Sequence, residues 1–228
     1  MEENKLPSMS EKEERAQQLT KALFSGKFDE ARQSTYAALG RGNSNREVLD
    51  ALVEAVSIVA DLHEVGEYDQ VRVAATESAV NSCLQVLEDW LAKSQGRFDL
   101  KVTIGPVGLK AGGVMSVALS AALRSVGFFS TNLSKTKTAL ELLRNSEELR
   151  ADIVIALLPA EGVEGHVRNF AEEVERGGFK GRFEVILLAP GLPSEVHSSL
   201  AIVRNSGEAI TKATEIALKK RSGPRTPV

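Results

Sequence analysis

The residues best suited to chemistry form a glycine-rich stretch, residues 105–113, with the sequence Gly-Pro-Val-Gly-Leu-Lys-Ala-Gly-Gly. It follows a short apolar segment and precedes a helical pattern, so free N–H groups and the helix dipole would favour an anion beside Lys110. Leu109 stands where a Walker A loop has glycine, and the glycine spacing does not match the dinucleotide-binding fingerprint. An anion site and a purely structural glycine turn are therefore both open interpretations.

The histidines and serines outside this stretch do not form a recognisable catalytic set. His166 and His197, with Glu161 and Glu164, would suit a metal or an acid–base cluster, but no His-x3-His spacing occurs. The alternative for these side chains is a solvated surface. Because the sequence contains no Gly-x-Ser-x-Gly motif for a nucleophilic serine, we expect no catalytic residues and no independent enzyme activity.

The composition is that of a globular protein in a reducing compartment. Of 228 residues, 43% are hydrophobic and 26% charged, and Cys83 is the only cysteine, which excludes an intrachain disulfide and a cysteine-rich zinc site. The longest uncharged stretch, residues 111–123, is shorter than the roughly 20 residues of a membrane-spanning helix. The N-terminus is charge-dense and lacks the apolar core of a signal peptide. We therefore expect a cytoplasmic protein with no membrane association.

Charge is divided unevenly along the chain. Residues 1–95 hold 17 acidic and 10 basic residues, a net charge of −7, whereas residues 96–228 hold 14 acidic and 18 basic residues, a net charge of +4. This division predicts electrostatic complementarity between two domains or with a protein partner. Neither half has the dense basic stripe or interleaved aromatic residues of a nucleic-acid-binding protein.

The first 95 residues have the apolar periodicity of four helices. Capping boxes at residues 10–13 and 44–47 mark two helix starts, and Gly26, Gly40 and Gly66 mark helix ends. We expect residues 1–9 to be disordered and the domain to be a small antiparallel bundle. Its helices are predicted over residues 10–24, 28–39, 44–60 and 69–91.

The rest of the chain alternates between strand and helix patterns. The apolar run 152–158 is typical of a strand buried on both faces of a parallel sheet. The pattern predicts a five-stranded, parallel, doubly wound, Rossmann-like α/β domain over residues 96–228, with a disordered tail from residue 222. Strands are expected over residues 100–104, 128–132, 152–158, 183–189 and 200–203, and helices over residues 114–126, 136–149, 163–176 and 207–221.

A helical bundle followed by a short linker and a five-stranded α/β domain resembles the corrinoid carrier proteins of methyltransferase systems. Residues 60–68, Ala-Asp-Leu-His-Glu-Val-Gly-Glu-Tyr, are similar to a turn segment of that family, and residues 101–107, 127–128 and 151–154 to its first three strands. The resemblance implies that the bundle caps a cobalamin-binding-type domain. It also implies a carrier or accessory role beside a methyltransferase-like or regulatory protein partner.

The motif that ligates cobalt in that family is altered here. The family's Asp-x-His-x-x-Gly falls on Lys110, Gly112 and Met115. In the family the histidine lies beneath the cobalt and the aspartate orients it through its other ring nitrogen. Glycine cannot ligate a metal, so the lower axial ligand is missing.

The two motifs that receive the cofactor's nucleotide tail are altered as well. The family's Ser-x-Leu falls on Leu157 and Pro159, and its Gly-Gly pair falls on Leu188 and Ala189. The first replacement removes a hydroxyl donor, and the second fills the space that glycines leave. We therefore predict that apolar side chains close the channel for the tail.

The resemblance also draws attention to His63. It stands where the family usually has an aromatic or apolar residue over the upper face of the corrin. An imidazole there would ligate cobalt, or less readily haem iron, from the bundle side. The alternative is a cation favoured by the dipole at a helix C-terminus, with no metal involved.

Two functions are consistent with these residues. One is a non-catalytic protein that holds a cobalamin-type tetrapyrrole between bundle and sheet without the lower axial histidine. The other is a cofactor-free interaction or regulatory module derived from the same fold. The sequence indicates no oligomeric state. The predicted cofactor-binding residues are His63, Gly108, Lys110, Gly112, Gly113, Met115, Leu157, Leu188 and Ala189, with His63 as the candidate metal ligand.

Overall fold

The N-terminal half is helical, as predicted, in a computed structural model that describes residues 9–192, 195–197 and 200–222. Its helices are α1 (Met9–Phe24), α2 (Phe28–Gly40), α3 (Asn45–Glu64) and α4 (Gln70–Ser94). The capping box of α3 is confirmed, because Ser44 Oγ accepts from the Glu47 amide and the Glu47 carboxylate accepts from the Ser44 amide. The first box differs: α1 begins at Met9, so Ser10 lies inside the helix. Of the residues predicted to be disordered, 1–9, Met9 is instead the first residue of α1, and residues 1–8 lie outside the described residues.

The C-terminal half contains the predicted parallel sheet, with one additional strand. The strand order is β2-β1-β3-β4-β6-β5, in which β5 alone runs antiparallel to its neighbour. The sequence analysis missed β5 because three residues between polar and proline-containing segments give no apolar alternation. The elements are β1 (Lys101–Pro106), α5 (Gly112–Val126), β2 (Phe129–Asn132), α6 (Ala139–Glu148), β3 (Ile153–Leu157), α7 (Val163–Arg176), β4 (Glu184–Leu188), β5 (Glu195–His197), β6 (Leu200–Val203) and α8 (Ser206–Ser222).

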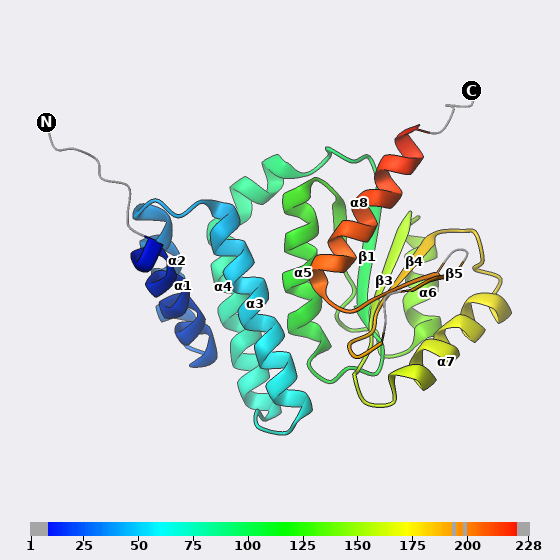
Figure 1. Ribbon diagram of the computed structural model, residues 1–228, viewed down its shortest axis with the longest axis horizontal. Helices are drawn as coiled ribbons and strands as arrows, with labels where there is room; N and C mark the ends of the chain where they lie inside the picture. The colour runs from blue at the N-terminus through cyan, green and yellow to red at the C-terminus, as the bar shows by residue number, and fades with distance from the viewer. Residues whose placement is uncertain (1–8, 193–194, 198–199, 223–228) are drawn as a thin grey trace, which may run out of the picture.

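Helices cover both faces of the sheet (Figure 1). α5 and α8 pack on one face and α6 and α7 on the other. Along β3, Ile153, Ile155 and Leu157 belong to the first core and Val154 and Ala156 to the second, and all five are fully buried. This confirms the prediction that the apolar run is a strand covered on both faces. The predicted tail beyond Ser222 lies outside the described residues.

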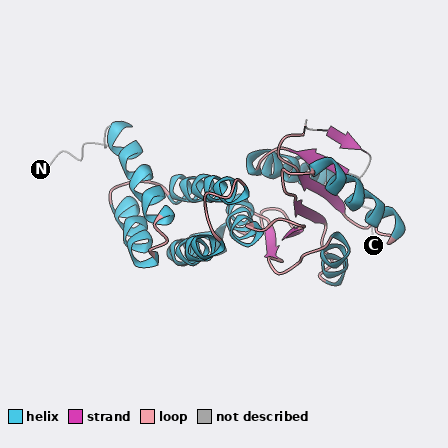
Figure 2. Cartoon of the chain, turned by 90° about the horizontal axis from the view of Figure 1, so that it is seen from below, coloured by secondary structure: helices cyan, strands magenta, loops and turns pink. Residues whose placement is uncertain are grey.

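α5 belongs to both halves of the molecule. Its small residues Ala118 and Ala121, with Val114, pack into the core of the bundle against α3 and α4. Its larger residues Leu119 and Leu123 pack on the sheet. Figure 2 shows the resulting order, with the bundle helices beside α5 and the sheet beyond it. The division into residues 1–95 and 96–228 stays a prediction.

The core of the bundle also contains the single cysteine. Cys83 is fully buried, and burial raises the pKa of its thiol, although a hydrogen bond with Thr35 acts in the opposite direction. A buried neutral thiol is a poor nucleophile. No helix of the described residues is long and apolar enough to cross a membrane.

Candidate functional site

Two loops meet at the carboxyl ends of β1 and β2. The Gly108 amide, in the loop from β1 to α5, donates to the Lys137 carbonyl at 3.3 Å. The single proton of the buried Thr136 hydroxyl, in the loop from β2 to α6, is shared between the carbonyl oxygens of Pro106, 3.2 Å away, and Leu133, 2.9 Å away. A Cβ at Gly105 would lie 2.5 Å from Thr136 Oγ1, so the close approach of the two loops requires glycine there.

A solvent-open cavity of about 490 Å³ lies between these loops. Three lysines line it, Lys110 from the first loop and Lys135 and Lys137 from the second. In the described part of the chain, none of their ammonium groups has a salt-bridge partner within 4.0 Å. The other lining residues are Pro106, Gly108, Leu109, Gly113, Ser134 and Thr136.

The predicted cofactor-binding residues are divided among three places. Gly108, Lys110 and Gly113 line this cavity. Gly112 does not, because it packs directly on Pro106, where an added Cβ would lie only 2.0 Å from Pro106 Cβ. No side chain of any size fits at position 112 in this backbone, which is the position that aligns with the lower axial histidine.

The residues aligned with the tail-binding motifs are part of the hydrophobic core. Leu157 and Ala189 are fully buried and Leu188 is 2% exposed. Leu157 and Leu188 pack on the face covered by α5 and α8, and Ala189 on the opposite face. Met115 is half-buried and contacts both the bundle core and the core beneath α5. These apolar side chains are thus covered by the helices that pack on the two faces of the sheet.

His63 lies apart from the cavity, in the last turn of α3. Its Nδ1 lies 2.6 Å from the Tyr68 carbonyl oxygen, to which it must donate. The neutral ring then presents a lone pair on Nε2, and this atom is buried without a hydrogen-bond partner. The connection from α3 to α4, which contains Tyr68, lies at the same end of the molecule as the loop from β1 to α5 (Figure 1).

The alternative metal cluster does not form among the described residues, which contain no group of three or more candidate ligands. His166 instead packs against the first loop, where its Cε1 would lie 3.2 Å from a Cβ at Gly108. The side chain of His197 lies outside the description. Sequence reasoning missed Lys135 and Lys137, although the spacing Lys-x-Lys directly after β2 was a usable signal.

This chain is similar to known proteins in structure but not detectably in sequence. No family model matches the sequence, and no curated protein matches it significantly. The Methanosarcina barkeri monomethylamine corrinoid protein superposes with a TM-score of 0.65 over 90% of this chain and 99% of that one, at 14% identity. This chain has the corrinoid-protein fold.

Two further corrinoid-related structures are similar over most of their length. The methanol:cobalamin methyltransferase complex of Methanosarcina barkeri has 16% identity and a TM-score of 0.45, covering 95% of this chain and 86% of that one. A cobalamin-binding protein of Desulfitobacterium hafniense has 12% identity and a TM-score of 0.44, covering 88% and 97%.

The corrinoid-protein fold is retained here without residues that fit the cofactor in its usual mode. Position 112 has no room for an imidazole, and core side chains occupy the positions aligned with the tail channel. Cobalamin inserted by its nucleotide tail and ligated from below does not fit this chain. The fold is therefore separable from the site that the family builds on it.

Proposed function

We propose that this protein is a non-catalytic binding module that uses the corrinoid-protein fold without a cobalamin ligated from the α/β domain. The contact between Gly112 and Pro106 carries the proposal. A Cβ at position 112 would overlap Pro106 Cβ, at 2.0 Å, so packing against the Pro106 ring leaves no space for a ligating side chain there.

The proposal is supported by the packing of the sheet. Leu157, Leu188 and Ala189 are no more than 2% exposed, which is consistent with side chains that fill the space tail insertion would need. Opening such a region would expose apolar surface to water, at roughly 25 cal/mol per Å². Closure therefore stabilises the fold while removing the cofactor channel.

A protein partner is supported by the outer surface of the bundle. On α2, Phe28 and Tyr36 are 54% and 53% exposed, although aromatic side chains usually gain by burial. They stand eight residues apart on one helix face, and the Arg32 guanidinium lies 5.9 Å from the Tyr36 ring centroid. Exposed aromatic residues beside an arginine are typical of a protein interface, and we propose that a regulatory partner binds there.

The test is retention of a corrinoid by the purified protein. The protein is incubated with hydroxocobalamin and, separately, with haem, then passed through gel filtration, and the visible spectrum of the protein peak is recorded. We expect no corrinoid absorbance beyond that of an unrelated protein. Stoichiometric retention of cobalamin by both the wild type and His63→Ala would contradict the proposal.

A second candidate, ligation of a tetrapyrrole from the bundle side, is favoured by one observation. His63 Nε2 is a buried nitrogen lone pair without a partner, which is the chemistry of a metal ligand. If this candidate holds, cobalamin retained by the wild type is lost in His63→Ala but not in His166→Ala, which removes another half-buried imidazole. Retention that is equal in both variants would exclude His63 as the ligand.

A further inference from the structure

We propose that the cavity between the β1–α5 and β2–α6 loops binds the phosphate group of a small molecule. Lys110, Lys135 and Lys137 line it from two loops that are 25 residues apart in sequence at their nearest lysines. Three ammonium groups around one cavity repel one another, and an anion placed among them relieves that repulsion. Of the three lysines, only Lys110 was predicted from the sequence to bind a ligand.

The lysines are free to act on a ligand. In the described residues, none of the three has an acidic side chain within salt-bridge distance. Two carboxylates lie beside lining residues, but neither is within salt-bridge distance of the three ammonium groups. The Glu141 carboxylate accepts from the Lys137 backbone amide at 3.0 Å, and the Glu77 carboxylate lies against Gly113 on the side facing α4.

Uncharged donors complete the site. α5 has no side-chain cap at Ala111 and no acidic residue in its first turn, so its positive end is uncompensated by its own residues. Gly113 lines the cavity, and its amide donates to no carbonyl outside the helix, in contrast to Gly112, whose amide donates to the Leu109 carbonyl. α6 differs, because Thr138 caps it and Glu141 lies in its first turn.

The cavity is held open before any ligand binds. The Thr136 hydroxyl and the Gly108 amide tie the two loops together, so the lysines are presented by a fixed backbone. Its volume, about 490 Å³, lies within the range of small-molecule sites and exceeds what phosphate alone would fill. The ligand class is therefore a phosphorylated organic molecule of about nucleotide size.

This inference rests on the proposed function in one respect: the β1–α5 loop must not be covered by a bound corrinoid. The two proposals fail separately. Corrinoid retention by both the wild type and His63→Ala contradicts the proposed function, whereas the phosphate site is judged from anion titrations.

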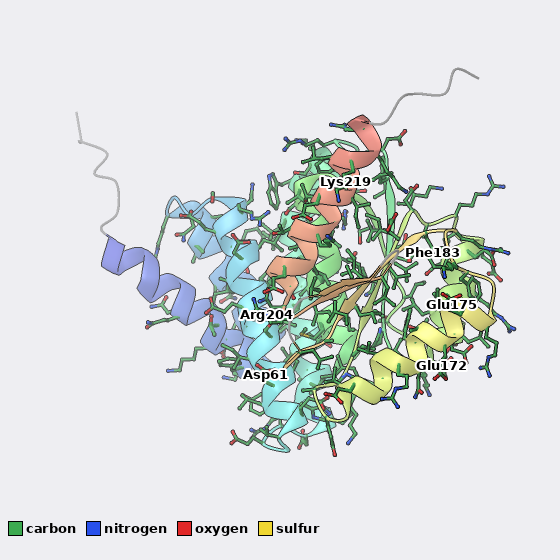
Figure 3. The ribbon with its side chains drawn as sticks, turned by 45° about the vertical axis from the view of Figure 1, so that its right-hand side comes forward. Asp61, Glu172, Glu175, Phe183, Arg204 and Lys219 are labelled. Carbon is green, nitrogen blue, oxygen red and sulfur yellow. The ribbon has the colours of Figure 1, made fainter. Side chains whose placement is uncertain are left out.

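The experiment is isothermal titration of the full-length protein with pyrophosphate and, separately, with ADP. The test variant is the double substitution Lys135→Gln/Lys137→Gln. The matched control is Lys93→Gln/Lys219→Gln, which makes the same change in net charge at two exposed lysines in the last turns of α4 and α8. Figure 3 labels Lys219 near the end of α8, on the opposite side of the molecule from Asp61 of α3.

We expect saturable binding by the wild type and by the control, and binding weakened about tenfold or more in Lys135→Gln/Lys137→Gln, as expected for lost charge-assisted hydrogen bonds. The affinity should fall with ionic strength. Tighter binding of ADP than of pyrophosphate would assign the rest of the cavity to the nucleoside. The proposal is overturned if neither probe binds, or if test and control variants weaken binding equally.

Discussion

Among single residues, the contact between Gly112 and Pro106 limits most clearly which side chains the loop after β1 accepts. An added Cβ at Gly112 would lie 2.0 Å from Pro106 Cβ, a distance that real Cβ atoms do not adopt. Pro106 is the last residue of β1 and is itself fixed by the sheet. The glycine is therefore required by packing, independently of any ligand.

Gly112→Ala should consequently lower the free energy of unfolding by about 1–3 kcal/mol, the usual cost of overpacking. The control is Gly165→Ala, in the first turn of α7, where an added Cβ meets nothing within 4 Å. That substitution should raise stability by about 1 kcal/mol or less, because alanine favours the helix. Urea unfolding followed by circular dichroism measures both. Equal effects of the two substitutions would show that Pro106 yields to a side chain at position 112.

The sequence shows glycine at position 112 but not the contact with Pro106 that requires glycine there. An alignment shows which residue type is present, whereas the distance to Pro106 depends on how the chain folds back after Val107. The same limit applies to Lys135 and Lys137, whose role depends on a loop that approaches from the next strand.

α5 was predicted from the sequence as a helix, but its packing against both the bundle and the sheet was not predicted. The sequence predicted a helix at this position, and the structure extends it by two residues to Gly112–Val126. The uncharged stretch 111–123 is too short to span a membrane, and its lack of charge also indicates a helix buried within the protein. In physical terms, a helix without a polar face is buried on all sides, and α5 is buried between bundle and sheet.

A fragment comprising residues 96–222 tests this role of α5. It should fold, because both faces of the sheet keep their helices, but it should expose Val114, Ala118 and Ala121, which the bundle normally covers. We therefore expect stronger fluorescence of the dye 8-anilinonaphthalene-1-sulfonate, and a lower melting temperature, than for the full chain. A fragment as stable as the full chain, with no added dye binding, would show that the two halves do not depend on their contact.

At the scale of the whole molecule, the chain has the corrinoid-protein fold, and we propose that it lacks the ligand chemistry of that family. The corrinoid-protein fold is recognisable at 14% identity because it depends on the pattern of apolar residues, which many side chains satisfy. That pattern is why the bundle and five parallel strands could be predicted from the sequence. The ligand site depends on a few positions, and at those positions this chain has glycine and apolar side chains.

Thermal unfolding of Leu188→Gly/Ala189→Gly beside the parent, with and without cobalamin, tests directly whether apolar side chains replace the cofactor channel. If the two side chains fill a channel, restoring glycines costs burial, creates a cavity and adds chain entropy, about 2–5 kcal/mol in total. For a chain of this size, that corresponds to a melting temperature roughly 5–15 °C lower. Leu149→Gly, at a leucine that is 41% exposed, is the control and should change it much less. Cobalamin should stabilise neither protein, because position 112 still excludes a lower ligand. An unchanged melting temperature in the double variant, or tight cobalamin binding by the parent, would contradict the account.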